Sequence, residues 1–302
     1  MRRGSKYVFI ISFLAVPVAL YSVFVVAAYI QTFTLSLKTW SGLGSIPARS
    51  SFDNYVTLWH DSLFWMSLRH NIVLLIALPI ITIFVALVIA FLLNVGGGFH
   101  GGVTRGVWGS KTYRVIFFFP QLLALAIVAV IFGRVFAPDQ SGLLNGLLPT
   151  DSAQIWLADK RLALICILVV LIWQAIGFYV VLFSAAMGSI PTDIYEAAAL
   201  DGATRFKLFF RITIPLLWNT VQVAWVYLGI AAFDAFPLVN IMSVDRGGPD
   251  GATSVLSMMI YRNTFELSKV GYASALGGVL FFLTLTFAAL TLRVTRRDSV
   301  EL

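Results

Sequence analysis

The chain has 302 residues, of which 59% are hydrophobic and only 12% are charged. A soluble globular domain carries about 25% charged residues, so this composition excludes one and indicates an integral membrane protein. The net charge of +7 would indicate nucleic-acid binding only if the basic residues formed one groove, and they are instead scattered between apolar stretches. A single cysteine, Cys166, excludes an intramolecular disulfide and a cysteine-based zinc site.

Six apolar stretches are each long enough, as a helix, to cross a hydrocarbon layer of about 30 Å. Because backbone groups in lipid need partners within the segment, we expect an all-α membrane protein. The first stretch is too long for the hydrophobic part of a signal peptide and is predicted to be a retained span. The predicted spans are 8–30, 72–93, 115–136, 162–187, 212–233 and 272–292, which makes residues 1–302 a single transmembrane domain.

The positions of lysine and arginine predict the orientation, because cytoplasmic loops are enriched in both. If both termini are cytoplasmic, the inner segments hold twelve of the 21 basic residues and five of the 14 acidic residues. The rest of the chain then holds equal numbers of each, so all the excess positive charge lies on one side. We therefore expect a multi-pass protein of the cell membrane with both termini in the cytoplasm and no nucleic-acid partner.

Residues 191–215 form the one sizeable stretch that is neither long and apolar nor a simple turn. Pro191 and the helix-forming residues up to Leu200 predict a short helix, and Gly202 falls where a helix ends in a left-handed residue. A second short helix is predicted over 205–212. The pattern indicates a helix–turn–helix loop that projects into the cytoplasm between the fourth and fifth spans.

This loop resembles the "EAA" loop of ABC-importer permeases. The residues that carry the resemblance are Glu196, Ala197, Ala198, Gly202, Ile212, Ile214 and Pro215, with Ile214 where the family more often has leucine. In that family the loop forms a coupling helix that docks in a groove of the cytoplasmic ATPase. The resemblance implies that Glu196 anchors the helix against a basic residue of the ATPase and that Gly202 permits the bend. Asp201 and Arg205 are expected to hold the shape of the loop.

Other segments resemble the carbohydrate importers of the same family, and together they cover nearly all of the chain from residue 52 onward. They are Asp53-Asn54-Tyr55, Phe64-Trp65, Arg69-His70-Asn71, Phe119-Pro120, residues 142–145, Ile172-Trp173-Gln174 and Gly247-Gly248-Pro249. The resemblance is to maltose- and glycerol-phosphate-type sugar permeases, in the subunit that comes first of the pair. It implies a six-helix type I importer fold with a cytoplasmic coupling helix. The implied partners are a second homologous permease, two cytoplasmic ABC ATPase subunits and an extracytoplasmic sugar-binding protein.

No catalytic or metal site is expected in the chain itself. Residues 106–112 look like a phosphate-binding loop, but Ser110 stands where that loop needs a glycine before Lys111, and no strand pattern precedes it. ATP and Mg are therefore expected on the partner ATPase. The three histidines are scattered without ligand spacing, so no metal is expected.

Polar residues inside spans are costly in hydrocarbon and are therefore candidates for function. Amides can hydrogen-bond the hydroxyls of a sugar, and aromatic rings can stack on its apolar face. Alternatively, the same groups make hydrogen bonds between helices or lie at the interface, and the sequence leaves both interpretations open. The candidate residues of a substrate passage are Trp173, Gln174, Tyr179, Gln222, Trp225 and Asp234.

We therefore expect the permease subunit of an ATP-driven ABC importer that moves a mono- or oligosaccharide across the cytoplasmic membrane. One alternative is an ABC permease for a non-sugar solute, although an anion permease should carry more basic residues in its spans than the single Arg134. Another is a secondary transporter or channel, which the coupling loop argues against.

Overall fold

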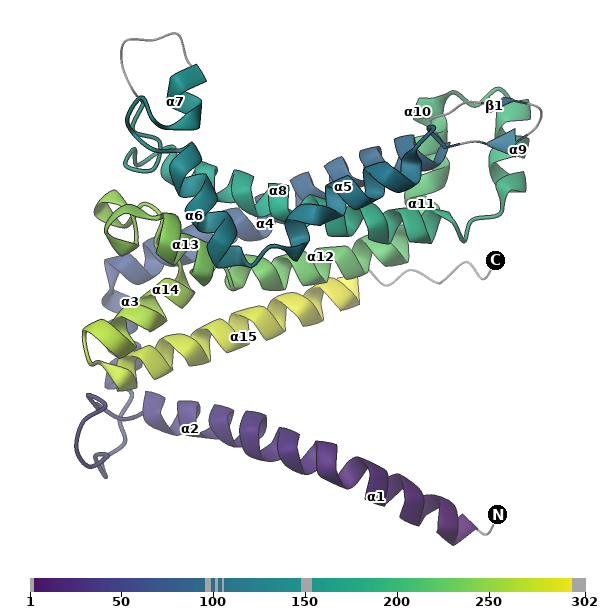
Figure 1. Ribbon diagram of the computed structural model, residues 1–302. Helices are drawn as coiled ribbons and strands as arrows, with labels where there is room; N and C mark the ends of the chain where they lie inside the picture. The colour runs from purple at the N-terminus through teal and green to yellow at the C-terminus, as the bar shows by residue number, and fades with distance from the viewer. Residues whose placement is uncertain (1–2, 96–98, 101–102, 105, 148–153, 295–302) are drawn as a thin grey trace. The chain divides into compact units, whose positions relative to one another are not determined.

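The computed structural model describes residues 3–95, 99–100, 103–104, 106–147 and 154–294. Most of these residues are helical, as the sequence predicts (Figure 1). The chain divides into two compact units. One comprises the residues up to 64 together with 259–282, and the other comprises residues 65–258 with those from 283 onward.

The first unit contains the N-terminal span and a short helix that is tied to its end. Its elements are α1 (Arg3–Tyr21), the π-helical turn Ser22–Val26, α2 (Ala27–Ser36), α3 (Asp53–His60), the start of α4 (Ser62–Val95), the end of α14 (Leu256–Tyr261), the π-helical turn Arg262–Glu266 and the start of α15 (Val270–Val294). Asn54 is buried at the start of α3, and its Nδ2 donates to the carbonyls of Ser36 and Lys38 at 2.8 and 2.9 Å. These two bonds fix α3 at the end of the first span.

The second unit holds the remaining spans and the loop that resembles a coupling helix. Its elements are the rest of α4, the antiparallel pair β1 (Phe99–His100) and β2 (Val103–Thr104), α5 (Ser110–Leu122), α6 (Leu125–Val135), α7 (Leu143–Leu147), α8 (Ala163–Met187), α9 (Thr192–Leu200), α10 (Arg205–Lys207), the π-helical turn Leu208–Thr213, α11 (Ile214–Leu216), α12 (Trp218–Phe233), α13 (Phe236–Met242), the 3-10 turns Val244–Arg246 and Pro249–Gly251, the start of α14 and the end of α15. Figure 1 shows α9, α10 and β1 together at one end of this unit.

Four helical stretches in the described part of the chain are long and apolar enough to cross a membrane, and two bent helix pairs raise the number to six if each pair is one span. The four are Ile10–Ser36, Ser62–Val95, Ala163–Met187 and Val270–Arg293, and the pairs are Ser110–Leu122 with Leu125–Val135 and Arg205–Leu216 with Trp218–Phe233. The second stretch begins at Ser62, ten residues before its predicted start.

The sequence predicts continuous third and fifth spans, whereas the structure bends both. Helices α5 and α6 meet at 95°, because Leu123 and Ala124 have extended backbone. The helices on either side of Leu217 meet at 74°. Ahead of this second bend, Pro215 has no N–H to donate to the preceding turn, and that turn widens to a π-helix. Hydropathy alone does not register either break, because both halves of each span are apolar.

Helices α5 and α8 approach closely at Gly177, in the middle of α8. A Cβ atom on Gly177 would lie 1.8 Å from the carbonyl oxygen of Phe117. On either side of this glycine, α8 buries Val170 and Val180 completely. The glycine therefore lets two helix backbones pack against each other without an intervening side chain, as small residues do between membrane helices.

We expect Gly177→Ala to lower the stability of the protein, because the added methyl group overlaps the backbone of α5. Overpacking of this kind costs about 1–3 kcal/mol. The matched control is Gly133→Ala on α6, where no atom lies within 4 Å of the added Cβ. Thermal unfolding of both variants in detergent measures the difference, and equal melting temperatures would contradict the close approach of α5 and α8.

Candidate functional site

The predicted cytoplasmic loop folds as a helix, a left-handed turn and a second short helix. Helix α9 ends at Leu200, and Gly202 follows with a φ of 74°. The N–H of Ala203 donates to the Ala198 carbonyl at 2.9 Å, and the N–H of Gly202 donates to the Ala199 carbonyl at 3.0 Å. These two bonds form a Schellman motif, which pairs the last carbonyls of the helix. Gly202 therefore holds the left-handed position that its place in the sequence predicts.

The second short helix is capped by Thr204, whose hydroxyl accepts from the N–H of Lys207 at 3.4 Å. At the start of α9, Pro191 occupies the cap position and no side chain bonds there. The turn between the two helices is thus defined by backbone bonds on one side and by a threonine cap on the other.

The inner face of the loop is fixed to the spans by aromatic side chains. Tyr195 is 3% exposed, and its hydroxyl lies 3.2 Å from the Thr213 hydroxyl in the turn that leads into the fifth span. Burial raises the pKa of the Tyr195 phenol, so it stays neutral at physiological pH. Phe209 is also buried and packs edge-on against Phe91 of α4, with ring centroids 5.2 Å apart.

The outer face of the loop is exposed and contains most of the predicted coupling residues. Leu200 and Phe206 are 90% and 71% exposed. Glu196 and Ala198 are half-buried, and the exposed members of the predicted set are Ala197, Asp201, Gly202, Arg205 and Pro215. Asp201 and Arg205 form no ion pair with each other, so the backbone bonds and the cap define the turn.

The predicted passage residues on α8 divide into buried and exposed groups. Gln174 and Tyr179 are each 6% exposed, whereas Trp173 is 40% exposed and packs edge-on against Phe132. The Gln174 side chain donates to the Leu123 carbonyl at 3.3 Å. Because Leu123 lies in the break between α5 and α6, this amide pairs a carbonyl that the bend removes from the regular helix ladder.

The predicted passage residues on and after α12 are less deeply buried. Gln222 and Trp225 are half-buried, and Trp225 packs against the core of the second unit. Asp234 follows the last residue of α12 and is exposed. None of the six predicted residues lines the pocket of about 920 Å³ in the first unit or the pocket of about 400 Å³ in the second unit.

Comparison with known proteins gives the family. The chain is 38% identical over 296 residues to the diacetylchitobiose uptake system permease protein NgcF of Streptomyces coelicolor, covering 96% of this chain and 83% of that protein. The chain belongs to the permease proteins of ABC transporters. It is also 31% identical to the probable ABC transporter permease protein YurN of Bacillus subtilis, covering 95% and 96% of the two chains. No protein-family model matches the sequence.

The solved structures give the fold of this permease. It matches a chain of a bacterial ABC transporter involved in the import of the acidic polysaccharide alginate, with a TM-score of 0.80 and 21% identity. The match covers 98% of this chain and 97% of that one. The expected importer-permease fold is confirmed, and family membership decides against the secondary transporter.

Two polar clusters of the permease were not predicted as functional. Asn71 is completely buried, donates to the Ala232 carbonyl at 3.1 Å and accepts from the Leu256 N–H at 2.9 Å. Asn94 accepts from the Arg114 guanidinium at 2.7 Å, which joins α4 to α5. A sequence signal exists in each case, since each asparagine stands directly at an end of the predicted span 72–93, where a polar side chain needs a partner.

We expect Gln174→Leu to destabilise the permease, because the Leu123 carbonyl loses its partner in an apolar setting. An unpaired buried acceptor costs about 1–3 kcal/mol. Gln121→Leu is the matched control, since Gln121 is exposed on α5. Both melting temperatures are measured on purified protein. If Gln174→Leu and the control have the same melting temperature, the amide does not support the bend. That result would favour the interpretation of Gln174 as a passage residue.

Proposed function

We propose that the chain is the membrane permease subunit of an ATP-driven importer that carries a sugar across the cytoplasmic membrane. The relative with 38% identity is named for uptake of diacetylchitobiose, and others at 28% identity are named for multiple sugars and for lactose. The observation that carries the proposal is the exposed helix–turn–helix loop, which is fixed to the spans on one face and free of this chain on the other.

In this proposal, the loop docks on a cytoplasmic ATPase that binds ATP and Mg. Large apolar side chains on an exposed loop mark an interaction surface, and Leu200 and Phe206 provide them. Glu196 would pair with a basic residue of the ATPase at the rim of this contact. Apart from its chain neighbours, none of the described residues has an atom within 4 Å of a Cβ at Gly202, which leaves the turn open for the ATPase to approach.

The passage is proposed to form between this permease and a second homologous one. Gln222 and Trp225 remain its best candidates here, since both are half-buried within one chain. Trp173 and Asp234 have exposed surface that the second permease or the sugar would cover. Gln174 and Tyr179 are assigned to the wall behind the passage because they are buried already.

The orientation is proposed from the charge distribution, with both termini and the coupling loop in the cytoplasm. The loops on the opposite side would then receive the sugar from an extracytoplasmic binding protein. A chain of the bacterial alginate ABC transporter matches this chain with a TM-score of 0.79. That transporter was solved in complex with a periplasmic protein bound to an alginate pentasaccharide.

The coupling role is tested with Gly202→Ala. No atom would clash with the new methyl group, so its effect comes from the left-handed φ, which costs a residue with a Cβ about 1–2 kcal/mol. We expect sugar-stimulated ATPase activity of the reconstituted transporter to fall about tenfold, which corresponds to about 1.4 kcal/mol.

Gly44→Ala is the matched control, because Gly44 has a φ of 72° and equally open surroundings in the loop after the first span. The same backbone strain there should leave the activity unchanged. Equal activities of the two variants, with intact assembly, would remove the loop from the coupling mechanism. If sugar did not stimulate the ATPase activity of either variant, the proposal that the transported solute is a sugar would be refuted.

The orientation is tested with single cysteines in a Cys166→Ser background. Leu43 is 77% exposed in a predicted outer loop, and Trp108 is 96% exposed in a predicted cytoplasmic loop. We expect Leu43→Cys to react with a membrane-impermeant thiol reagent in intact cells and Trp108→Cys to react only after permeabilisation. The reverse pattern would place the coupling loop outside and refute its contact with an ATPase.

A further inference from the structure

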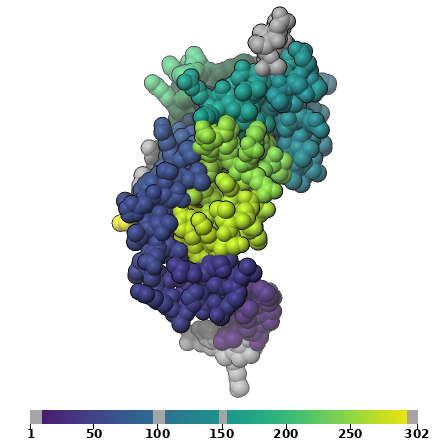
Figure 2. Space-filling model, turned by 90° about the vertical axis from the view of Figure 1, so that its left-hand side faces the viewer, coloured from purple at the N-terminus to yellow at the C-terminus, as the bar shows by residue number. Residues whose placement is uncertain are grey.

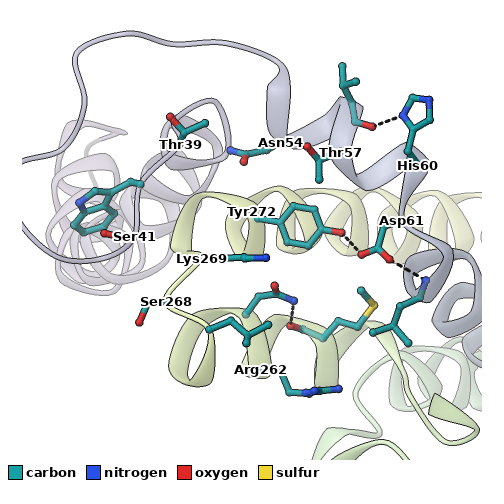
Figure 3. A pocket seen from close by; sticks show the side chains of 16 residues that line it. Thr39, Ser41, Asn54, Thr57, His60, Asp61, Arg262, Ser268, Lys269 and Tyr272 are labelled. Carbon is teal, nitrogen blue, oxygen red and sulfur yellow. Dashed lines mark hydrogen bonds between the residues drawn. The ribbon is translucent and has the colours of Figure 1, made fainter. Parts of the chain in front are cut away.

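The first unit contains a pocket of about 920 Å³ that lies at the ends of two spans (Figure 3). Thr39 and Trp40 line it just beyond Ser36, where the first span ends. Lys269 and Tyr272 line it where α15 begins. The space-filling view shows the two segments side by side, residues 37–60 in dark blue and the segment before α15 in yellow-green (Figure 2). A pocket at the ends of spans lies at the level of lipid headgroups.

The pocket contains one anion with remaining capacity to accept hydrogen bonds. The Asp61 carboxylate accepts from the Tyr272 hydroxyl at 2.6 Å and from the Leu63 N–H at 2.8 Å. A carboxylate offers about four lone-pair positions, so two remain. Both donors are neutral, and the negative charge of Asp61 is therefore not balanced by either of them.

The pocket also contains a cation without an acidic partner among the described residues. The Lys269 ammonium forms no ion pair there, whereas the Arg262 guanidinium has Glu266 at 3.6 Å. In Figure 3 Lys269 and Asp61 lie on either side of the Tyr272 ring. One unbalanced cation and one unbalanced anion thus line the same hollow.

The surroundings of the pocket are apolar. Val56 and Leu267 contribute to its walls and are 57% and 50% exposed. Trp59 and Phe265, from the helix and turn that supply pocket residues, are 64% and 72% exposed. Exposed aromatic residues at the ends of spans are typical of the membrane interface. A fully polar ligand would make no favourable apolar contacts with these side chains, whereas an acyl chain would bury its apolar surface against them.

We propose that this pocket binds the headgroup of a zwitterionic phospholipid, with the phosphate at Lys269 and the ammonium at Asp61. Phosphate oxygens accept charge-assisted hydrogen bonds from lysine, and a primary ammonium donates three to carboxylates and similar acceptors. The acyl chains lie along the apolar rim. A neutral sugar would leave both charges unbalanced, so the pocket is distinct from the proposed passage in the ligand it selects.

The test uses the intact transporter, exchanged into detergent micelles that contain phosphatidylethanolamine or phosphatidylglycerol, with retained lipids counted by native mass spectrometry. We expect Lys269→Gln to reduce retained phosphatidylethanolamine several-fold. Arg49→Gln is the matched control, since Arg49 is exposed in the same unit but does not line the pocket. Asp61→Asn keeps an acceptor for the Leu63 N–H and should shift the preference from phosphatidylethanolamine toward phosphatidylglycerol.

Three results would overturn the proposal. Equal retention by Lys269→Gln and Arg49→Gln would show that the pocket holds no lipid. Complete displacement by millimolar inorganic phosphate would show a simple anion site, to which the acyl chain contributes nothing. Displacement by a sugar from a panel of mono- and disaccharides, lost in Lys269→Gln, would show a solute site.

Discussion

A carbonyl or N–H group in hydrocarbon finds no water, and this constraint governs how the spans of the permease can deviate from straight helices. A straight span such as α8 pairs its backbone groups within itself. The bend between α5 and α6 cannot, because Leu123 and Ala124 leave the helical conformation. Gln174 supplies the missing partner for the Leu123 carbonyl, so the bend of the third span depends on a side chain of the fourth.

The same constraint changes how polar residues in the spans should be interpreted. Gln174 pairs a broken backbone, and Asn71 does the same at the end of α12 and the start of α14. Both residues are buried and have backbone partners, so neither needs a solute to explain it. An amide within a span is therefore evidence of a passage only where the backbone around it is already paired.

The sequence predicts those features that are local. Long apolar runs predict the spans, and Gly202 after an alanine-rich stretch predicts the left-handed turn, because each depends on residues that are neighbours in the chain. The bends are not predicted, since hydropathy averages over a whole span. The pocket of the first unit is not predicted either, because its walls come from segments far apart in the chain, as the bond between Asp61 and Tyr272, 211 positions apart, illustrates.

The loop of α9 and α10 combines a fixed face with an exposed one, and the proposed coupling to an ATPase would depend on this asymmetry. If α9 were held only by its two chain ends, a displacement by the ATPase would be absorbed in the turn. Tyr195 instead bonds Thr213 at the entrance to the fifth span, and Phe209 packs on α4. A movement of α9 must therefore either break a buried hydrogen bond and an aromatic contact or carry the fifth span with it. Because close-packed contacts resist partial displacement, the proposed coupling would carry the fifth span along with the loop.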